Sequence, residues 1–327
     1  MGEGSMTRLL SRHPQSSRFY TSRGIMNFFY RLYQYGMDRY QSARDPITRK
    51  SIEAMIRLAV LILMRCQGIR FPRRSTGGMR WIWGWRLEFL MGWNEPESVK
   101  WCRQLICPGM TVIDIGAHIG YFTRLFSELV GSSGRVLAFE PHPENVQVLR
   151  ANLKKSRYKN VEIFHSAISD RTGAATLYVS PGHSNHSLLP GYTETKGQVE
   201  VECFTLDAFL SSRGIREVDF IKIDVEGSEP FVLAGMKQTV SQSPALRILA
   251  EFNPQALRCG GIPPAEFIHI FQKTGFEVKG ILPDGSLGEV PPTLDQTINL
   301  LCVPHALAKT TNDKKRNRRA RRDRGDL

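Results

Sequence analysis

Three charged side chains lie at alternate positions in an otherwise apolar segment, Phe220-Ile-Lys-Ile-Asp-Val-Glu226. A β-strand directs alternate side chains to one face, so Lys222, Asp224 and Glu226 would lie together. Charged groups on a buried strand are costly unless they are paired or used in a reaction. We therefore expect either a reactive centre or a structural lysine–carboxylate cluster that holds the end of the strand.

A turn with two glycines follows another apolar strand, in Val112-Ile-Asp-Ile-Gly-Ala-His-Ile-Gly120. Glycines at 116 and 120 allow backbone conformations that other residues avoid, and they let a ligand approach the main chain closely. The helix that follows would present unpaired N–H groups at its N-terminus. The pattern indicates a nucleoside-binding turn, although dinucleotide-binding turns and tight structural turns look similar.

Acidic side chains also end the next two predicted strands. Glu140 follows the segment Arg135–Phe139. A carboxylate in that place can accept hydrogen bonds from both hydroxyls of a ribose. Ser169 and Asp170 close the third strand, and Asp170 is our candidate contact for the exocyclic amine of an adenine.

Three further residues are candidates for contacts to a substrate other than the nucleoside. Glu251 lies near the end of the segment Leu246–Phe252, and it either contacts that substrate or has a structural role. His183 and His186 are candidate proton acceptors, because neutral imidazole is available near pH 7, although loop histidines are often plain surface. We assign no metal ligand. The metal requirement stays open because Asp224, Glu226 and Glu251 could form an oxygen-ligand site.

These candidate residues can form one site only if the fold brings the ends of their strands together. From Met110 onward, short apolar segments alternate with helical patterns, which is typical of an α/β, doubly wound parallel sheet. The stretch Ala174–Cys203 interrupts the alternation, and we interpret it as an inserted hairpin with an active-site loop. The predicted strands are Thr111–Ile115, Arg135–Phe139, Val161–Ala167, Asp219–Val225, Leu246–Phe252, Phe276–Ile281 and Thr297–Val303.

Charge divides the 327 residues into three regions. The formal net charge is +13, but the positive excess lies in residues 1–80 and 309–327, and acidic residues outnumber basic ones between them. We predict a basic, partly helical N-terminal extension (1–80), a catalytic domain (81–308) and a disordered basic tail (309–327). Because the middle region is slightly acidic, we expect that the catalytic domain does not bind nucleic acid.

The N-terminal extension contains a predicted helix from Pro46 to about Cys66, with Asp45 as its N-cap. Its apolar run, Leu58–Met64, is too short to cross a bilayer. This helix docks on the main domain or lies at a membrane surface. The basic residues at both ends of the chain predict weak peripheral association with anionic membranes.

The six cysteines form no Cys-x-x-Cys pair and have no histidines at metal-binding spacing, so a zinc site is not expected. Nothing in their spacing resembles a disulfide framework. No apolar segment typical of a signal peptide follows the first basic residues. We therefore expect a reducing, cytoplasmic location.

Five motifs occur together in one order. They are Asp-Ile-Gly-Ala-His-Ile-Gly-Tyr-Phe-Thr (114–123), Phe-Glu-Pro-His-Pro-Glu-Asn (139–145), Ala-Ile-Ser-Asp (167–170), Thr-Leu-Asp (205–207) and Ile-Lys-Ile-Asp-Val-Glu-Gly-Ser-Glu (221–229). Together they closely resemble the motifs of the FkbM-type methyltransferases. The resemblance covers roughly residues 81–303, and it does not reach the basic ends.

The resemblance implies a Rossmann-like methyltransferase domain with a mostly parallel seven-stranded sheet, an antiparallel last strand and S-adenosylmethionine as methyl donor. It implies methylation of a hydroxyl on a sugar, glycan or small natural product. His118 stands where such proteins commonly have Asn. The implied donor contacts are Asp114, Gly116, Ala117, His118, Gly120, Tyr121, Glu140, Pro141, Ser169, Asp170 and Asp224.

Our mechanistic hypothesis is that Asp224 and Glu226, with Lys222, order the methyl-bearing end of the donor and the acceptor oxygen. Three other functions remain open. An NAD-dependent oxidoreductase shares the sheet but expects a Gly-x-Gly-x-x-Gly turn, which this sequence lacks. A nucleic-acid methyltransferase would use the basic ends, and Asn253-Pro254 partly resembles the Asn-Pro-Pro motif of amino-methylating enzymes. The third is a non-catalytic, donor-binding scaffold.

Overall fold

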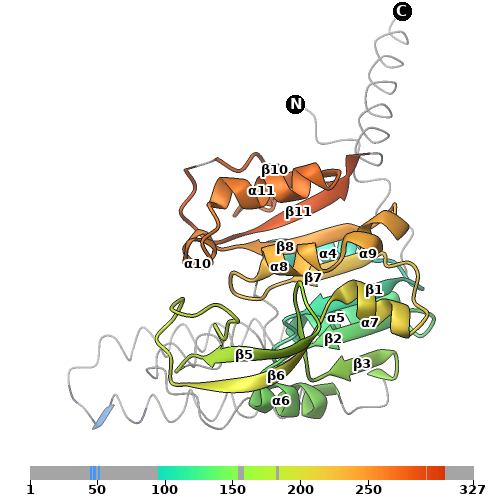
Figure 1. The fold of residues 1–327 in the computed structure, drawn as a ribbon. Helices are drawn as coiled ribbons and strands as arrows, with labels where there is room; N and C mark the ends of the chain where they lie inside the picture. Colours follow the sequence, from blue (N-terminus) through green and yellow to red (C-terminus); the bar gives the residue numbers. More distant parts are fainter. Residues whose placement is uncertain are drawn as a thin grey trace, which may run out of the picture.

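A computed structural model of the chain describes residues 45, 47–48, 51, 95–153, 158–181, 184–291 and 293–305 (Figure 1). Most of the predicted N-terminal helix, the tryptophans at 81–85 and the basic tail lie outside these residues. The predicted cap is present, since the backbone N–H of Thr48 donates to Asp45 Oδ1 at 2.7 Å.

The main sheet has eight strands among the described residues, in the order β10-β9-β11-β8-β7-β1-β2-β3. Neighbours from β3 to β8 are parallel, whereas β11 runs antiparallel to β8 and β9. The strands are β1 (Thr111–Ile115), β2 (Arg135–Phe139), β3 (Val161–Phe164), β7 (Phe220–Ile223), β8 (Arg247–Phe252), β9 (Phe276–Ile281), β10 (Leu287–Gly288) and β11 (Ile298–Pro304).

This topology confirms the mostly parallel sheet and the antiparallel last strand. The two-residue strand β10, which pairs antiparallel with β9, adds an eighth strand to the seven that were expected. A strand of two residues has no periodicity that a sequence pattern could display. The expected strand Val161–Ala167 is divided, because β3 ends at Phe164 and a separate short strand, β4 (Ala167–Ile168), follows.

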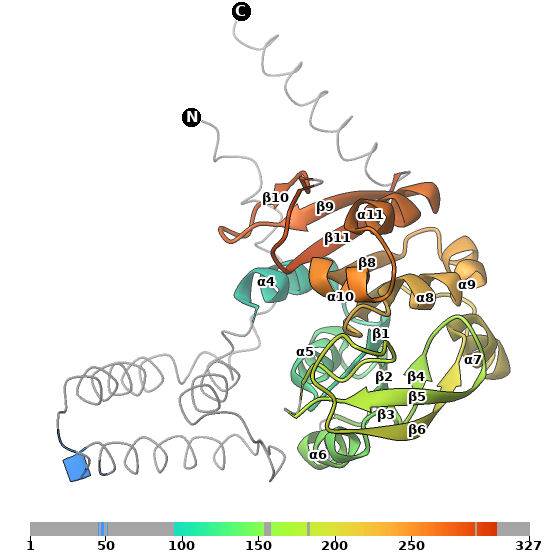
Figure 2. The same cartoon turned by 60° about the vertical axis from the view of Figure 1, so that its left-hand side comes forward.

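Helices cover both faces of the main sheet, as Figure 2 shows. Side chains of β1 alternate between the faces: Ile113 belongs to the core cluster that includes residues of α7, α8 and α11, whereas Val112 belongs to the cluster that includes residues of α4 and α5. The helices are α4 (Pro96–Leu105), α5 (Tyr121–Val130), α6 (Pro143–Leu153), α7 (Leu206–Ser212), α8 (Glu229–Ala234), α9 (Lys237–Gln242), α10 (Pro254–Cys259) and α11 (Pro264–Lys273).

The segment Ala174–Cys203 forms the inserted hairpin that the sequence predicts. Strands β5 (Gly173–Val179) and β6 (Gly197–Phe204) pair antiparallel, and β4 joins β6 in a second, three-stranded sheet. Figures 1 and 2 both place this hairpin beside β2 and β3. The loop between β5 and β6 therefore starts close to the carboxyl ends of the parallel strands.

No helix among the described residues is both long and apolar enough to cross a membrane.

Candidate active site

The first glycine of the turn after β1 lies where three strands meet. Gly116 has a φ of 85°, and its N–H donates to the carbonyl of Phe139 at the end of β2. A Cβ at this position would lie 1.8 Å from the carbonyl oxygen of Asp224, which follows β7. Any side chain at residue 116 would thus separate the ends of β1 and β7.

The second glycine of the turn begins helix α5. Gly120 has a φ of 93°, and a Cβ there would lie 2.6 Å from Cδ1 of Leu149 in α6. Asp114, at the other end of the turn, is buried and accepts a 2.6 Å hydrogen bond from the hydroxyl of Thr123. Burial raises the pKa of Asp114. These contacts shape the turn, and Asp114, Ala117, Gly120 and Tyr121 do not themselves line the cavity.

Glu140 is buried directly after β2, where the sequence placed it. Its Oε2 accepts the backbone N–H of His118 at 2.8 Å, and its Oε1 accepts that of His142 at 2.9 Å. Burial raises the pKa of Glu140 to about 7. The carboxylate thus links the turn after β1 to the chain after β2, and it faces the cavity that both segments line.

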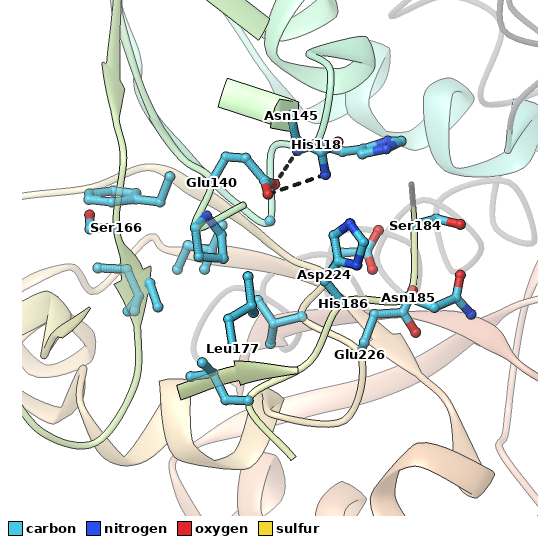
Figure 3. Close-up of a pocket in the computed structure, with 18 of the residues that line it drawn as sticks. His118, Glu140, Asn145, Ser166, Leu177, Ser184, Asn185, His186, Asp224 and Glu226 are labelled. Atoms are coloured by element: carbon cyan, nitrogen blue, oxygen red, sulfur yellow. Dashed lines mark hydrogen bonds between the residues drawn. The ribbon is translucent and has the colours of Figure 1, made fainter. Parts of the chain in front are cut away.

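This cavity lies over the carboxyl ends of β1, β2 and β7 (Figure 3). Gly116, His118 and Pro141 line it as predicted, whereas Ser169 and Asp170 do not. The chain after β3 presents Ser166, Ala167 and Ile168 to the cavity instead. Asp170 points elsewhere and forms a 3.8 Å ion pair with its exposed neighbour Arg171.

Sequence reasoning missed the contribution of Ser166. Its hydroxyl is buried, lines the cavity and has no hydrogen-bond partner within the part of the chain that the structure describes. Apolar side chains lie around it on the cavity wall, from Phe139, Ile168 and Leu177. A single serine between two strands gives no pattern that could have revealed this position.

At the end of β7, Lys222 is 3% exposed and forms a 2.6 Å ion pair with Asp224. Burial alone would lower the pKa of Lys222, but the negative charges of Asp224 and Glu95 raise it. The ammonium group also lies 4.7 Å from the centre of the Phe122 ring. Glu95, which the sequence did not single out, lines the same cavity.

Asp224, Glu226 and Glu251 come together beyond the ends of β7 and β8. Each offers one carboxylate oxygen, and these oxygens all lie within 4.8 Å of one another. Burial and the nearby Asp224 raise the pKa of Glu226 to about 8. The same two causes raise the pKa of Glu251 well above its ordinary value. We call these three residues the acid cluster.

A tyrosine from the inserted loop contacts the acid cluster, and the sequence analysis did not predict this contact. The Tyr192 hydroxyl donates to Glu226 Oε2 at 3.0 Å and accepts from Nδ2 of Asn253 at 2.9 Å. Ser187 of the same loop donates from its hydroxyl to the carbonyl of Glu226 at 2.8 Å. The loop between β5 and β6 thus lies over the cluster.

Of the two candidate loop histidines, His183 lies outside the described residues. His186 lines the cavity, and its ring lies against that of His142, with centroids 4.0 Å apart and the planes tilted by 34°. Its Nδ1 accepts the backbone N–H of Ser180 at 3.2 Å. In Figure 3 the His186 ring is drawn between Glu140 and Glu226.

The residues of the cavity fit S-adenosylmethionine. The buried hydroxyl of Ser166, which has no partner among the described residues, suits a hydrogen bond to the edge of an adenine. The apolar side chains around it suit the faces of the adenine ring. Glu140 at the tip of β2 suits the two ribose hydroxyls. Asp224 and Glu95 provide negative charge for a ligand that carries a sulfonium and an ammonium group.

Comparison with known proteins relates this chain to one family of methyltransferases. The model of the FkbM methyltransferase domain matches residues 114–277. The chain is 28% identical over 223 residues to the 2-O-methyltransferase NoeI of Sinorhizobium fredii, which covers 62% of this chain and 89% of that protein. It is 31% identical over 159 residues to the 31-O-demethyl-FK506 methyltransferase FkbM of Streptomyces tacrolimicus, which covers 40% of this chain and 60% of that protein.

Among solved structures, a putative rRNA-methylase from Clostridium thermocellum overlaps 64% of this chain and 94% of its own, with a TM-score of 0.42 and 10% identity. The family match begins at Asp114 and includes the glycine turn, Glu140 and the acid cluster. The chain therefore belongs to the FkbM methyltransferase family and is an S-adenosylmethionine-dependent methyltransferase.

Proposed function

We propose that the protein transfers a methyl group to a hydroxyl of a sugar, glycan or other small molecule. The observation that carries this proposal is the acid cluster, which adjoins the cavity beside Asp224 and provides carboxylates for an acceptor proton. Two relatives are described as methyltransferases that act on oxygen, which supports the same chemistry.

The chain's own residues bind and orient the donor. Glu140 holds the ribose, and Ser166 with the apolar cavity wall holds the adenine. The Lys222–Asp224 ion pair fixes the Asp224 carboxylate at the edge of the cavity. When bound, S-adenosylmethionine supplies an electrophilic methyl group, and transfer to a hydroxyl leaves S-adenosylhomocysteine and one proton. Because positioning dominates such a displacement, the rigid strand tips are the important support.

Glu226 takes the acceptor proton in this proposal, and Glu251 binds the acceptor oxygen beside it. A general base works best when its pKa lies near the working pH, and the pKa of Glu226 is raised to about 8. Tyr192 orients Glu226 through its hydroxyl. These roles of Lys222, Asp224, Glu226 and Glu251 retain the mechanistic hypothesis drawn from the sequence.

The test separates donor binding from turnover. We expect calorimetry to show binding of S-adenosylhomocysteine, and assays with hydroxylated sugars and polyketides to show methyl incorporation. Glu226→Gln should keep the donor affinity and lower turnover by about 10²-fold or more. Unchanged turnover would remove Glu226 from the chemistry. Donor binding without turnover on any acceptor would favour a scaffold, and a response to NAD alone would favour an oxidoreductase.

We also propose the three-region organisation, with the methyltransferase domain at 81–308 between basic ends at 1–80 and 309–327. The charge of those ends supports weak association of a cytoplasmic protein with anionic membranes. Pelleting with phosphatidylserine vesicles at low salt, and release at high salt, is the expected result. No pelleting, or pelleting that salt does not change, would contradict it.

A further inference from the structure

The acid cluster combines residues from two neighbouring strand ends. Asp224 and Glu226 follow β7, and Glu251 lies near the end of β8, which pairs with β7. One oxygen from each carboxylate lies within 4.8 Å of the others. Oxygen ligands of one Mg²⁺, at about 2.0–2.1 Å from the ion, lie up to about 4.2 Å apart, so the three oxygens would need to move together by about 0.6 Å at most to share it.

A second observation points to a missing ligand. Oε2 of Glu251 is closed off from solvent, and none of the described residues gives it a hydrogen bond. Leaving a buried polar oxygen without a partner is costly. A cation shared with the neighbouring carboxylates would satisfy this oxygen.

The local charge balance points the same way. Five carboxyl groups interact with Asp224, which forms the ion pair with Lys222. One ammonium group offsets the charge of only one carboxylate, so ionisation of the others needs further positive charge. The five are Glu95, Asp114, Glu226, Glu229 and Glu251.

The contacts already made leave oxygens available for a cation. Asp224 uses Oδ2 for Lys222, and Glu226 uses Oε2 for Tyr192. Each carboxylate has a second oxygen, for which no hydrogen bond is found among the described residues, and Oε2 of Glu251 has no partner there either. Three carboxylates form a donor set that hard divalent cations prefer.

We infer that Asp224, Glu226 and Glu251 bind one divalent cation, Mg²⁺ or Mn²⁺, at the acceptor side of the cavity. This inference rests on the proposed function. A cation there lowers the pKa of a hydroxyl that it contacts and orients the acceptor oxygen. The hydroxyl proton passes to the oxygen of Glu226 that does not contact the cation.

Direct titration with Mn²⁺ alone tests the site. The full chain is treated with EDTA, the chelator is removed, and free Mn²⁺ is followed by electron paramagnetic resonance without donor or acceptor. We expect one saturable site per chain. Glu251→Gln and Glu226→Gln should each weaken it by at least about tenfold, the scale known for perturbed metal sites. Glu202→Gln, on the exposed side of β6, is the matched control and should change nothing.

Binding of S-adenosylhomocysteine, measured in EDTA, distinguishes failure of the cation site from failure of the proposed function. Variants that still bind S-adenosylhomocysteine are folded, so their Mn²⁺ affinities can be interpreted. If millimolar Mn²⁺ does not bind, or if both cluster variants bind it as the Glu202→Gln control does, the cation site is wrong while the methyltransferase proposal stands. If S-adenosylhomocysteine itself does not bind, the proposed function fails.

Discussion

The hydroxyl of Tyr192 donates a 3.0 Å hydrogen bond to Oε2 of Glu226, although 34 residues separate them. The same hydroxyl accepts from Asn253, so one side chain connects the inserted loop to the ends of β7 and β8. The inserted loop, which would select the acceptor, is therefore hydrogen-bonded to Glu226, which would receive the proton of the acceptor hydroxyl.

Tyr192→Phe tests this connection. The variant leaves Oε2 of Glu226 and the amide of Asn253 without a partner, which costs roughly 1–3 kcal/mol. We expect kcat to fall by about tenfold or more, while the affinity for S-adenosylhomocysteine stays the same. Tyr178→Phe, on strand β5, is the control. Equal effects on kcat from both variants would show that the Tyr192 hydroxyl has no special role.

Glu140 predicts a pH dependence of donor binding. Its pKa is raised to about 7 by burial, so the carboxyl group takes up a proton as the pH falls below that value. Ribose hydroxyls donate to the ionised form, so donor affinity should increase as the pH rises toward 7 and level off above it. At pH 6, calorimetry in buffers of different ionisation enthalpy should detect proton release on binding.

Glu140→Gln should abolish that proton release and weaken donor binding by about tenfold or more. Ionisation of Glu140 has the opposite effect on the stability of the fold. Because the folded pKa lies above the unfolded value, ionisation destabilises the fold, so this contribution to the unfolding free energy falls between about pH 4.5 and 7. A donor affinity that is constant from pH 5 to 8 would contradict the ribose assignment.

Lys222 has a structural role that can be measured without substrate. Lys222→Met removes the buried cation that opposes the partly buried Asp224 and Glu95, and breaking a buried pair costs about 3–5 kcal/mol, an upper bound here. Lys279→Met removes a lysine that pairs with Glu277 near the surface, and should cost about 1 kcal/mol or less. Urea unfolding gives both values, and equal losses would show that the Lys222 pair contributes no more than a surface pair.

Comparison of Gly116→Ala with Gly191→Ala separates the cost of a steric clash from the cost of backbone strain. Both Gly116 and Gly191 have a positive φ, 85° and 80° respectively. A Cβ at 116 would lie 1.8 Å from the carbonyl oxygen of Asp224, whereas one at 191 has no atom within 4 Å. We expect Gly191→Ala to cost about 1 kcal/mol from strain alone. Gly116→Ala should cost several times more and abolish donor binding, as thermal melting with and without S-adenosylhomocysteine would show.

The sequence alone predicted the parallel sheet and most of its strand boundaries. Strands β1, β2 and β9 occupy the predicted residues, because their apolar runs are bounded by turn residues. It also placed Glu140, Lys222 and Asp224 at strand ends beside the glycine turn. Such positions are encoded locally, since a run of a few residues determines both the strand and the side chain that follows it.

The tertiary structure decided which side chains from distant segments meet. The break after Phe164 turns the chain, so that Ser166 faces the cavity in place of the predicted Ser169 and Asp170. Glu251 joins Asp224 and Glu226 because β8 pairs with β7, and Tyr192 reaches them because the hairpin folds over the sheet edge. Contacts between distant segments depend on how whole elements pack against one another, and no local pattern of residues records that packing.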